Sequence, residues 1–463
     1  MVKTFNFYSD IGWINDPNGL VYHDGCFHMF FQHHPDSSTW GPMHWGHATS
    51  QDLIHWTEQK IAMAPDRLGY IFSGSIVVDH ENRFGFGEDQ NTAWIAFFTH
   101  HNRKGYDRQD LNCEYQSAAF SLDNGMTWTK FEENPILANP GHLRDFRDPY
   151  VFWHNDSESW IMILSAGDRV NIYRSKSLTG WKLSCDFTVP VEDGAVWECP
   201  ILCELPVEET DETRWVLFQS FNPGGRYGGS GTRYFLGDFD GYAFSVCEHS
   251  QNYQEQNEAM WIDWGPDFYA MNVWTNAPSP DAGPIAIGWM SNWAYAKHTY
   301  EIPFRGSMSI PRRLSLRKMT DRLFVRSRPA FELDTKSVSD DAPNIQIDLD
   351  DASLCAVEIR CPTDELNQAA IRVMSKGQPI AWVQLDLKSN CWSIHREEAN
   401  PAETEDLSSG VFTFPRMVNS EDAIIELFIS NRGVELFFDD GIQTATLLLD
   451  QRKRVDEVAA SWG

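Results

Sequence analysis

The chain has 463 residues, with 66 Asp and Glu against 37 Lys and Arg, which gives a formal net charge of −29. A chain this acidic lacks the basic surface that nucleic-acid binding or attachment to an anionic membrane requires. Apolar residues make up 42% of the chain, including 19 Trp and 29 Phe, so a folded globular protein is predicted rather than a disordered one.

The N-terminal segment and the cysteines bear on cellular location. Residues 1–12 contain no apolar run long enough for a secretory signal, and no stretch of ~18 apolar residues could span a membrane. The nine cysteines are odd in number and widely scattered, which favours free thiols and a cytoplasmic protein. A secreted enzyme whose signal peptide is absent from this sequence is the alternative. No zinc-ligand spacing is present, and no metal, cofactor, nucleic acid or membrane partner is predicted; the oligomeric state is left open.

Five segments share one pattern, an apolar run followed by a polar turn and a second apolar run. They begin at Asp16, Ser75, Asp148, Glu198 and Asp267. Runs rich in Val, Ile, Phe and Trp between Asp, Asn and Gly clusters are typical of strands, whereas amphipathic helix periodicity is scarce. Five such units predict a five-bladed β-propeller, in which the first strand of each blade lines the axis. The acids at 16, 148 and 198 stand at equivalent positions in three units, so we expect them to converge at one end of that axis.

The second half of three units repeats as well. A serine opens a tight turn that ends at a tryptophan in 50–56, 121–128 and 175–181, which predicts the third and fourth strands of each blade. The glycine-rich run 224–231 lacks the Gly-Lys-Ser/Thr ending of a phosphate-binding loop and is predicted to be a flexible surface loop.

The pattern of the sequence changes from about residue 345. The segment 326–345 is interpreted as a linker, and from residue 346 short alternating strands follow one another, which predicts a β-sandwich. The expected organisation is therefore a propeller domain over 1–325, the linker over 326–345 and a sandwich domain over 346–463 with mainly a structural role.

Several motifs appear in a fixed order along the propeller segment. Residues 13–19 read Trp-Ile-Asn-Asp-Pro-Asn-Gly, 72–75 read Phe-Ser-Gly-Ser, 147–149 read Arg-Asp-Pro and 198–200 read Glu-Cys-Pro. Further motifs lie at 267–270, 288–293 and 305–309. Together they resemble the hallmarks of glycoside hydrolase family 32, which comprises invertases, inulinases, levanases and related fructosyltransferases. The resemblance covers essentially the whole chain, because that family pairs a five-bladed propeller with a C-terminal sandwich.

The resemblance implies a retaining glycosidase, in which one carboxylate is the nucleophile and another the acid/base. It assigns Asp16 as the nucleophile, Glu198 as the acid/base and Asp148 as the transition-state stabiliser. Cys199 follows the acid/base directly and is expected to tune its environment. The predicted substrate-binding side chains are Asn15, Gln32, Trp40, Phe72, Ser75, Arg147 and Trp293.

The protonation state of the acid/base can also be anticipated. A free Glu is only a few per cent protonated near pH 6, so partial burial and the neighbouring Asp16 are expected to raise the pKa of Glu198. Arg147 is expected to act in the opposite direction, either keeping Asp148 ionised or holding the substrate.

The predicted function is an exo-acting β-fructofuranosidase that cleaves sucrose or the terminal fructosyl units of fructans. The first alternative is a fructosyltransferase on the same scaffold, because acceptor choice depends on loop shape that the sequence does not reveal. An arabinofuranosidase-type propeller hydrolase is a second alternative. A non-catalytic sugar-binding propeller is a third, although the three acids argue against it.

Overall fold

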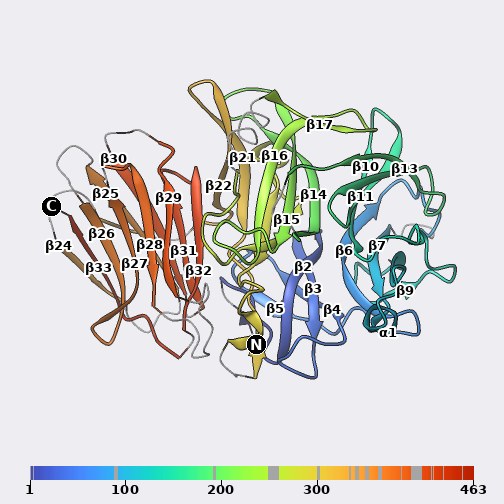
Figure 1. The fold of residues 1–463 in the computed structure, drawn as a ribbon, viewed down its shortest axis with the longest axis horizontal. Helices are drawn as coiled ribbons and strands as arrows, with labels where there is room; N and C mark the ends of the chain where they lie inside the picture. The colour runs from blue at the N-terminus through green and yellow to red at the C-terminus, as the bar shows by residue number, and fades with distance from the viewer. Residues whose placement is uncertain are drawn as a thin grey trace.

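Antiparallel β-sheets make up nearly all of the computed structural model (Figure 1). It describes residues 2–3, 5–87, 92–190, 194–248, 260–299, 303–332, 335–338, 344–349, 354–362, 368–386, 388–397, 409–418, 420, 422–430, 432–450 and 452–462. The all-β prediction, a five-bladed β-propeller followed by a β-sandwich, is confirmed. Within the described ranges, no helix is long and apolar enough to cross a membrane.

Each blade is an antiparallel sheet whose first strand is innermost. Blade 1 contains β2 (Gly12–His23), β3 (Cys26–His34), β4 (His44–Ser50) and β5 (Trp56–Glu58), with β1 (Val2–Lys3) at its outer edge. Blade 2 contains β6 (Tyr70–Asp79), β7 (Ala93–His101), β8 (Glu114–Ser121) and β9 (Thr129–Lys130), with the short helix α1 (Arg103–Asp107) after β7. Blade 3 contains β10 (Phe146–His154), β11 (Ser159–Ala166), β12 (Val170–Ser175) and β13 (Lys182–Phe187). Blade 4 contains β14 (Val196–Pro206), β15 (Thr213–Asn222), β16 (Gly231–Phe239) and β17 (Phe244–Val246).

Blade 5 closes the ring. It contains β18 (Tyr269–Trp274), β19 (Ile285–Trp289), β21 (Arg312–Met319) and β22 (Arg322–Pro329), with the 3₁₀ turns η1 (Pro280–Ala282) and η2 (Ala296–His298) in its loops. The innermost strands β2, β6, β10, β14 and β18 contact one another in that order, and β18 returns to β2. The short strand β20 (Phe304–Arg305) then pairs in parallel with β2, so the last blade is hydrogen-bonded to the first.

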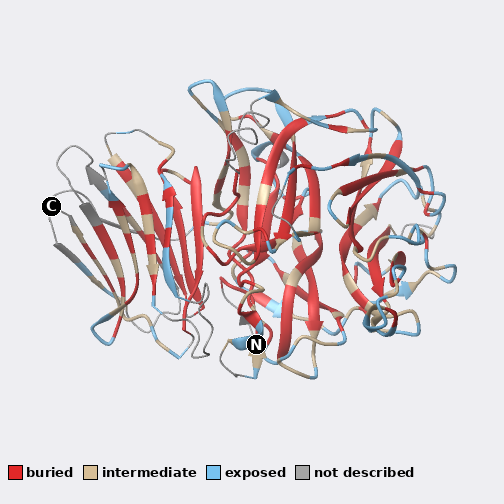
Figure 2. Cartoon of the chain, viewed as in Figure 1, coloured by how far each residue is buried: buried red, intermediate tan, exposed pale blue. Residues whose placement is uncertain are grey.

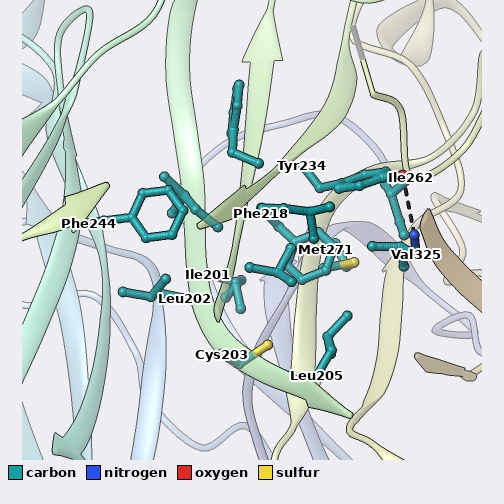
Figure 3. Close-up of a cluster of buried hydrophobic side chains, with 14 of the residues drawn as sticks. Ile201, Leu202, Cys203, Leu205, Phe218, Tyr234, Phe244, Ile262, Met271 and Val325 are labelled. Atoms are coloured by element: carbon teal, nitrogen blue, oxygen red, sulfur yellow. Dashed lines mark hydrogen bonds between the residues drawn. The ribbon is translucent and has the colours of Figure 1, made fainter. Parts of the chain in front are cut away.

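Hydrophobic cores fill the space between neighbouring blades, and the strands are buried along most of their length (Figure 2). The largest core joins blades 3, 4 and 5, and Figure 3 shows Ile201, Phe218 and Met271 facing one another within it. In the same core the Val325 amide donates a hydrogen bond of 3.3 Å to Tyr234 Oη, which links blade 5 to blade 4. These cores hold the inner strands at fixed distances around the axis.

The predicted serine-to-tryptophan turns are present in blades 1, 2 and 3. In each turn the indole Nε1 donates to the carbonyl three residues earlier: Trp56 to Leu53 at 3.1 Å, Trp128 to Gly125 at 3.0 Å and Trp181 to Leu178 at 2.8 Å. The shared bond explains why the same residue types recur at this spacing.

The C-terminal sandwich consists of two sheets that enclose their own apolar core. One sheet contains β23 (Thr335–Val338), β25 (Leu354–Pro362), β30 (Asp422–Ser430), β31 (Gly433–Phe438) and β32 (Gln443–Leu448). The other contains β24 (Asn344–Asp348), β33 (Glu457–Trp462), β26 (Gln368–Ser375), β27 (Gln378–Asp386), β28 (Cys391–Arg396) and β29 (Gly410–Pro415). Within the segment predicted as a linker, β22 continues to residue 329, while β23 and β24 already pair within the sandwich sheets. We propose that the two domains divide between residues 329 and 335.

The sandwich lies directly against the propeller, beside blade 5 (Figure 1). The glycine-rich run 224–231, expected as a flexible surface loop, instead packs onto the sandwich. Tyr227 contacts Phe412 with ring centroids 5.0 Å apart and donates to the Thr413 carbonyl at 3.3 Å. The run is a loop with Arg226 exposed, but its contact with the sandwich was not predicted, because glycines mark a loop and do not reveal what lies beside it.

Candidate active site

A β-bulge interrupts every innermost strand near its beginning. Two residues of the inner strand stand opposite one residue of its neighbour, at 15–16, 72–73, 148–149, 199–200 and 270–271. In blades 3, 4 and 5 the first bulged residue has a positive φ, namely Asp148 at 63°, Cys199 at 50° and Ala270 at 51°. Positive φ is unfavourable for residues with a Cβ, and bulges of this kind redirect side chains beside functional sites.

The predicted convergence of the three acids is confirmed, but their registers differ. Asp16 is the second residue of its bulge, Asp148 is the first, and Glu198 directly precedes its bulge. They line one pocket of about 330 Å³ at the end of the axis where the inner strands begin. Because each bulge shifts the alternation of side chains by one, non-equivalent positions face the same space.

Asp16 is held by neighbours on both oxygens. Oδ2 accepts from Ser73 Oγ at 2.6 Å, and the Cys199 thiol lies 3.6 Å from the same oxygen. Oδ1 accepts from Asn15 Nδ2 at 2.9 Å, and Asn15 Oδ1 in turn accepts from the indole of Trp13 at 2.8 Å. These contacts fix the orientation of the carboxylate before any ligand arrives.

Asp148 lies deeper, and the bulge of blade 4 holds it. Its Oδ2 accepts from the Cys199 amide at 2.9 Å, and the Cys199 thiol lies 3.7 Å away. The Asp148 amide donates to Thr99 Oγ1 at 3.0 Å, whose hydroxyl donates onward to Gln116 Oε1 at 2.7 Å. The Cys199 thiol therefore lies between the carboxylates of Asp16 and Asp148, whereas it was expected to act on Glu198.

Arg147 forms the centre of an ion-pair network beside the acids. Its Nη1 lies 2.6 Å from Asp145 and 3.0 Å from Glu114, and its Nη2 lies 3.1 Å from Glu198 Oε1. Glu114 is fully buried and also faces His101 Nδ1 at 3.0 Å. Burial by itself would raise the pKa of Glu114, but Arg147 and His101 outweigh it and hold that pKa below its usual range.

The environment of Glu198 raises its pKa, as the sequence predicts. Burial is the largest cause and the charge of Asp16 adds to it, whereas Arg147 and a hydrogen bond from Tyr269 act in the opposite direction. Tyr269 Oη donates to Glu198 Oε2 at 2.6 Å. Glu198 therefore retains a proton at a higher pH than an ordinary glutamate while one fifth of its side chain stays open to the pocket.

Asp148 is not kept ionised by Arg147, contrary to one of the two roles expected for that arginine. Burial raises the pKa of Asp148 to about 8, and the charges of Glu198 and Asp16 add to the effect. The arginine Nε is 4.0 Å from Asp148 Oδ2, whereas its terminal nitrogens lie closer to three other carboxylates. Arg147 lowers the pKa of Asp148, but it does not offset the effect of burial, because its charge is shared with those three carboxylates.

Comparison with known proteins places this pocket in a family. The profile of the glycosyl hydrolases family 32 N-terminal domain matches residues 7–327. The chain belongs to glycosyl hydrolase family 32. A levanase from Bacillus subtilis (strain 168) is 37% identical over 99% of this chain and 68% of its own length. An extracellular exo-inulinase from Aspergillus ficuum is 33% identical over 96% of this chain and 88% of its own length. The structure of a fructofuranosidase from Schwanniomyces occidentalis complexed with fructose aligns with a TM-score of 0.84 and 30% identity, covering 99% of this chain and 94% of that one.

Most residues that the family 32 motifs nominate lie in the pocket. It is lined by Asn15, Asp16, Gln32, Trp40, Phe72, Arg147, Asp148, Glu198 and Trp293 among the predicted residues. Cys199 lies just behind them. Ser75 does not line the pocket; it is buried between blades, where its hydroxyl donates to the Pro149 carbonyl at 3.0 Å and accepts from the Val151 amide at 2.9 Å. The serine of the same motif that reaches the pocket is Ser73.

Several residues of the site were not predicted from the sequence. Ser73 and Tyr269 lie within motifs that were recognised, but their registers relative to the bulges were not apparent. Glu114, His101, Arg103, Tyr106 and Lys297 also line the pocket. They come from outer strands and loops, and nothing in the repeat pattern distinguishes them from surface residues. Among the described residues, no group of three or more His, Cys, Asp or Glu is arranged to hold a metal ion.

Proposed function

We propose that this family 32 glycosidase is a retaining, exo-acting β-fructofuranosidase that hydrolyses sucrose and the terminal fructosyl units of fructans. The observation that carries the proposal is the pairing of Asp16 and Glu198 in one pocket. Asp16 is oriented by neighbouring donors, and Glu198 has a raised pKa and an open face. One carboxylate poised to attack and another poised to give a proton are what a retaining glycosidase needs.

In the first step, Asp16 attacks the anomeric carbon of the fructosyl unit while Glu198 transfers its proton to the leaving oxygen. The bond to the leaving group breaks as the ester bond to Asp16 forms, and the leaving group departs as a neutral alcohol. In the second step, the Glu198 carboxylate takes a proton from water as the water oxygen attacks the same carbon. Asp16 is released as a carboxylate, and the configuration is retained after two inversions.

Asp148 is assigned to transition-state stabilisation through the sugar hydroxyls. Its raised pKa leaves it protonated over part of the neutral range, so it can donate a hydrogen bond as well as accept one. Trp40, Phe72 and Trp293 supply apolar walls, while Asn15 and Gln32 supply polar groups for hydroxyl recognition. Apolar walls with convergent polar groups are typical of sites that take a small molecule.

The shape of the pocket supports exo action. Behind Ser73 and Asp148 lies a cavity of only about 10 Å³, room for about one water molecule. A polymer cannot pass along the axis through such a floor, which favours binding of a chain end, and the A. ficuum relative is named an exo-inulinase.

The cellular location is also informed by that relative. It is named extracellular, which supports the secreted alternative for this chain over the cytoplasmic one.

Product analysis tests the proposal. The wild type, assayed without added metal, is expected to release glucose and fructose from sucrose, and fructose alone from inulin and levan. Internal oligosaccharides from fructans would contradict exo action, products longer than the donor would favour a transferase, and arabinose release alone would favour an arabinofuranosidase.

Two substitutions test the assigned roles. Asp16→Asn and Glu198→Gln are each expected to lower kcat by at least about 10²–10⁴-fold, because each removes a chemical participant. Asp186→Asn on β13 changes an exposed carboxylate outside the pocket and serves as the matched control. Wild-type rates in both pocket variants would refute the mechanism.

A further inference from the structure

One wall of the pocket belongs to a segment that packs against the sandwich domain. The ring of Trp293 lines the pocket and stacks on Trp13 with centroids 5.8 Å apart. Its backbone amide donates to Ser230 Oγ of blade 4 at 3.1 Å. Two residues further along, Tyr295 is fully buried in a cluster with Met290 and Leu448, and Leu448 belongs to the sandwich strand β32.

Arg396, at the end of the sandwich strand β28, contacts this segment directly. Its Nη2 donates to Tyr295 Oη at 3.2 Å, and its guanidinium carbon lies 5.3 Å from the centre of the Tyr295 ring. Only 3% of Arg396 is exposed. A planar guanidinium buried in this way holds its partners in one geometry, because it presents several donors in a rigid fork.

The same guanidinium reaches a second element of the site. Arg396 Nη1 forms an ion pair with Asp267, which is fully buried and also accepts from the Leu448 amide at 2.8 Å. Asp267 stands two residues before Tyr269, whose hydroxyl donates to Glu198. Arg396 therefore lies next to the supports of both Trp293 and Tyr269, although none of the sandwich residues that the structure describes lines the pocket.

We propose that Arg396 is a positioning residue for the active site, and that the sandwich domain orients Trp293 through Tyr295 and Tyr269 through Asp267. The structural role expected for the sandwich thus extends to the geometry of the pocket. The inference rests on the proposed function for its kinetic assay, but not for its binding assay.

Arg416 provides a matched control inside the same domain. It is also a buried arginine, it pairs with Asp439 at 2.8 Å, and that aspartate also accepts from a backbone amide, that of Ile424 at 3.3 Å. Arg396→Met and Arg416→Met each leave one buried aspartate without its arginine, Asp267 of the propeller in the first case and Asp439 of the sandwich in the second, so both are expected to lower stability. Only the first removes contacts to the pocket supports.

The test compares Arg396→Met, Tyr295→Phe and Arg416→Met with the wild type, using sucrose kinetics from pH 4 to 9 and fructose binding by calorimetry. Arg396→Met is expected to raise KM and weaken fructose binding about three- to ten-fold with a smaller change in kcat, since an aromatic wall contacts ground state and transition state alike. It is also expected to move the alkaline limb of kcat/KM to higher pH, because a displaced Tyr269 would no longer donate its hydrogen bond to Glu198. Tyr295→Phe keeps Asp267 paired, so KM should rise about two- to five-fold with the alkaline limb unmoved.

Arg416→Met is expected to lower thermal stability while leaving KM, fructose affinity and the pH profile as in the wild type. The inference is overturned if Arg416→Met raises KM as much as Arg396→Met, or if folded Arg396→Met and Tyr295→Phe both bind fructose like the wild type. If Arg396→Met does not fold, Tyr295→Phe decides the question. A wild type that releases no fructose would refute the proposed function instead, and calorimetry would still measure the positioning effect.

Discussion

The hydrogen bond from Tyr269 to Glu198 offers a sharp test of how the pocket sets the proton affinity of its acid. The phenolic hydroxyl donates to Oε2 at 2.6 Å and lies against the carboxylate in a fully buried position. A donor of this kind favours the ionised form of Glu198 and so lowers a pKa that burial has raised. Tyr269→Phe removes the hydroxyl and keeps the ring.

The expected size of the effect follows from the strength of such a bond. A hydrogen bond to a charged group contributes about 1.5–3 kcal/mol, and one pKa unit corresponds to about 1.4 kcal/mol. Tyr269→Phe should therefore raise the pKa of Glu198 by about 1–2 units. Because the enzyme needs Glu198 protonated for the first step, the alkaline limb of kcat/KM should move to higher pH by the same amount.

The assay is the pH dependence of kcat/KM for sucrose from pH 4 to 9 in the wild type and the variant. Tyr150→Phe is the matched control, since Tyr150 is another buried phenol, on β10, whose hydroxyl bonds to Thr275 rather than to a site carboxylate. Its profile should coincide with that of the wild type. An alkaline limb that stays in place or moves to lower pH in Tyr269→Phe would refute the reasoning.

Three further outcomes follow from the other shifted groups. The pKa of Asp148 in the folded protein, about 8, exceeds its value in the unfolded chain, so its contribution to stability is present below pH ~4 and is lost as pH rises through about 8. The free energy of unfolding of Asp148→Asn, measured in urea, should therefore increase relative to that of the wild type by about 2–4 kcal/mol between pH 5 and 8. Burial lowers the pKa of His47 to about 3, so the wild type loses stability as pH falls below about 6.5. His47→Phe keeps an aromatic ring against Phe30, whose centroid lies 4.2 Å from that of His47. Between pH 6.5 and pH 4, the free energy of unfolding of this variant should fall by about 2–3 kcal/mol less than that of the wild type. Cys199→Ala removes the thiol shared by two carboxylates and should lower kcat/KM by about three- to ten-fold, whereas an unchanged value would assign the thiol to packing alone.

The repeat in the sequence was enough to predict the fold and the meeting of three distant acids. Runs of β-branched and aromatic residues between turn signals define strands locally, and five similar units imply a ring whose first strands share the axis. The rise in the pKa of Glu198 was likewise predictable, because burial and the charge of a neighbouring acid both disfavour the ionised form of a carboxyl group. The substrate-binding role of Ser75 was not supported, because neither the repeat nor the motif reveals a bulge that turns Ser73 toward the pocket and Ser75 away from it.

The sequence by itself determined the family, the architecture and which three carboxylates meet in the pocket, since these depend on local patterns and on motifs that lie within single strands. Only the tertiary structure decided which ion pairs these carboxylates form and how deeply each is buried. Arg147 stands beside Asp148 in the chain, yet its guanidinium lies closer to Glu114 and Glu198, which come from other blades. Contacts between elements far apart in sequence leave no periodic trace, and burial and charge pairing depend on those contacts.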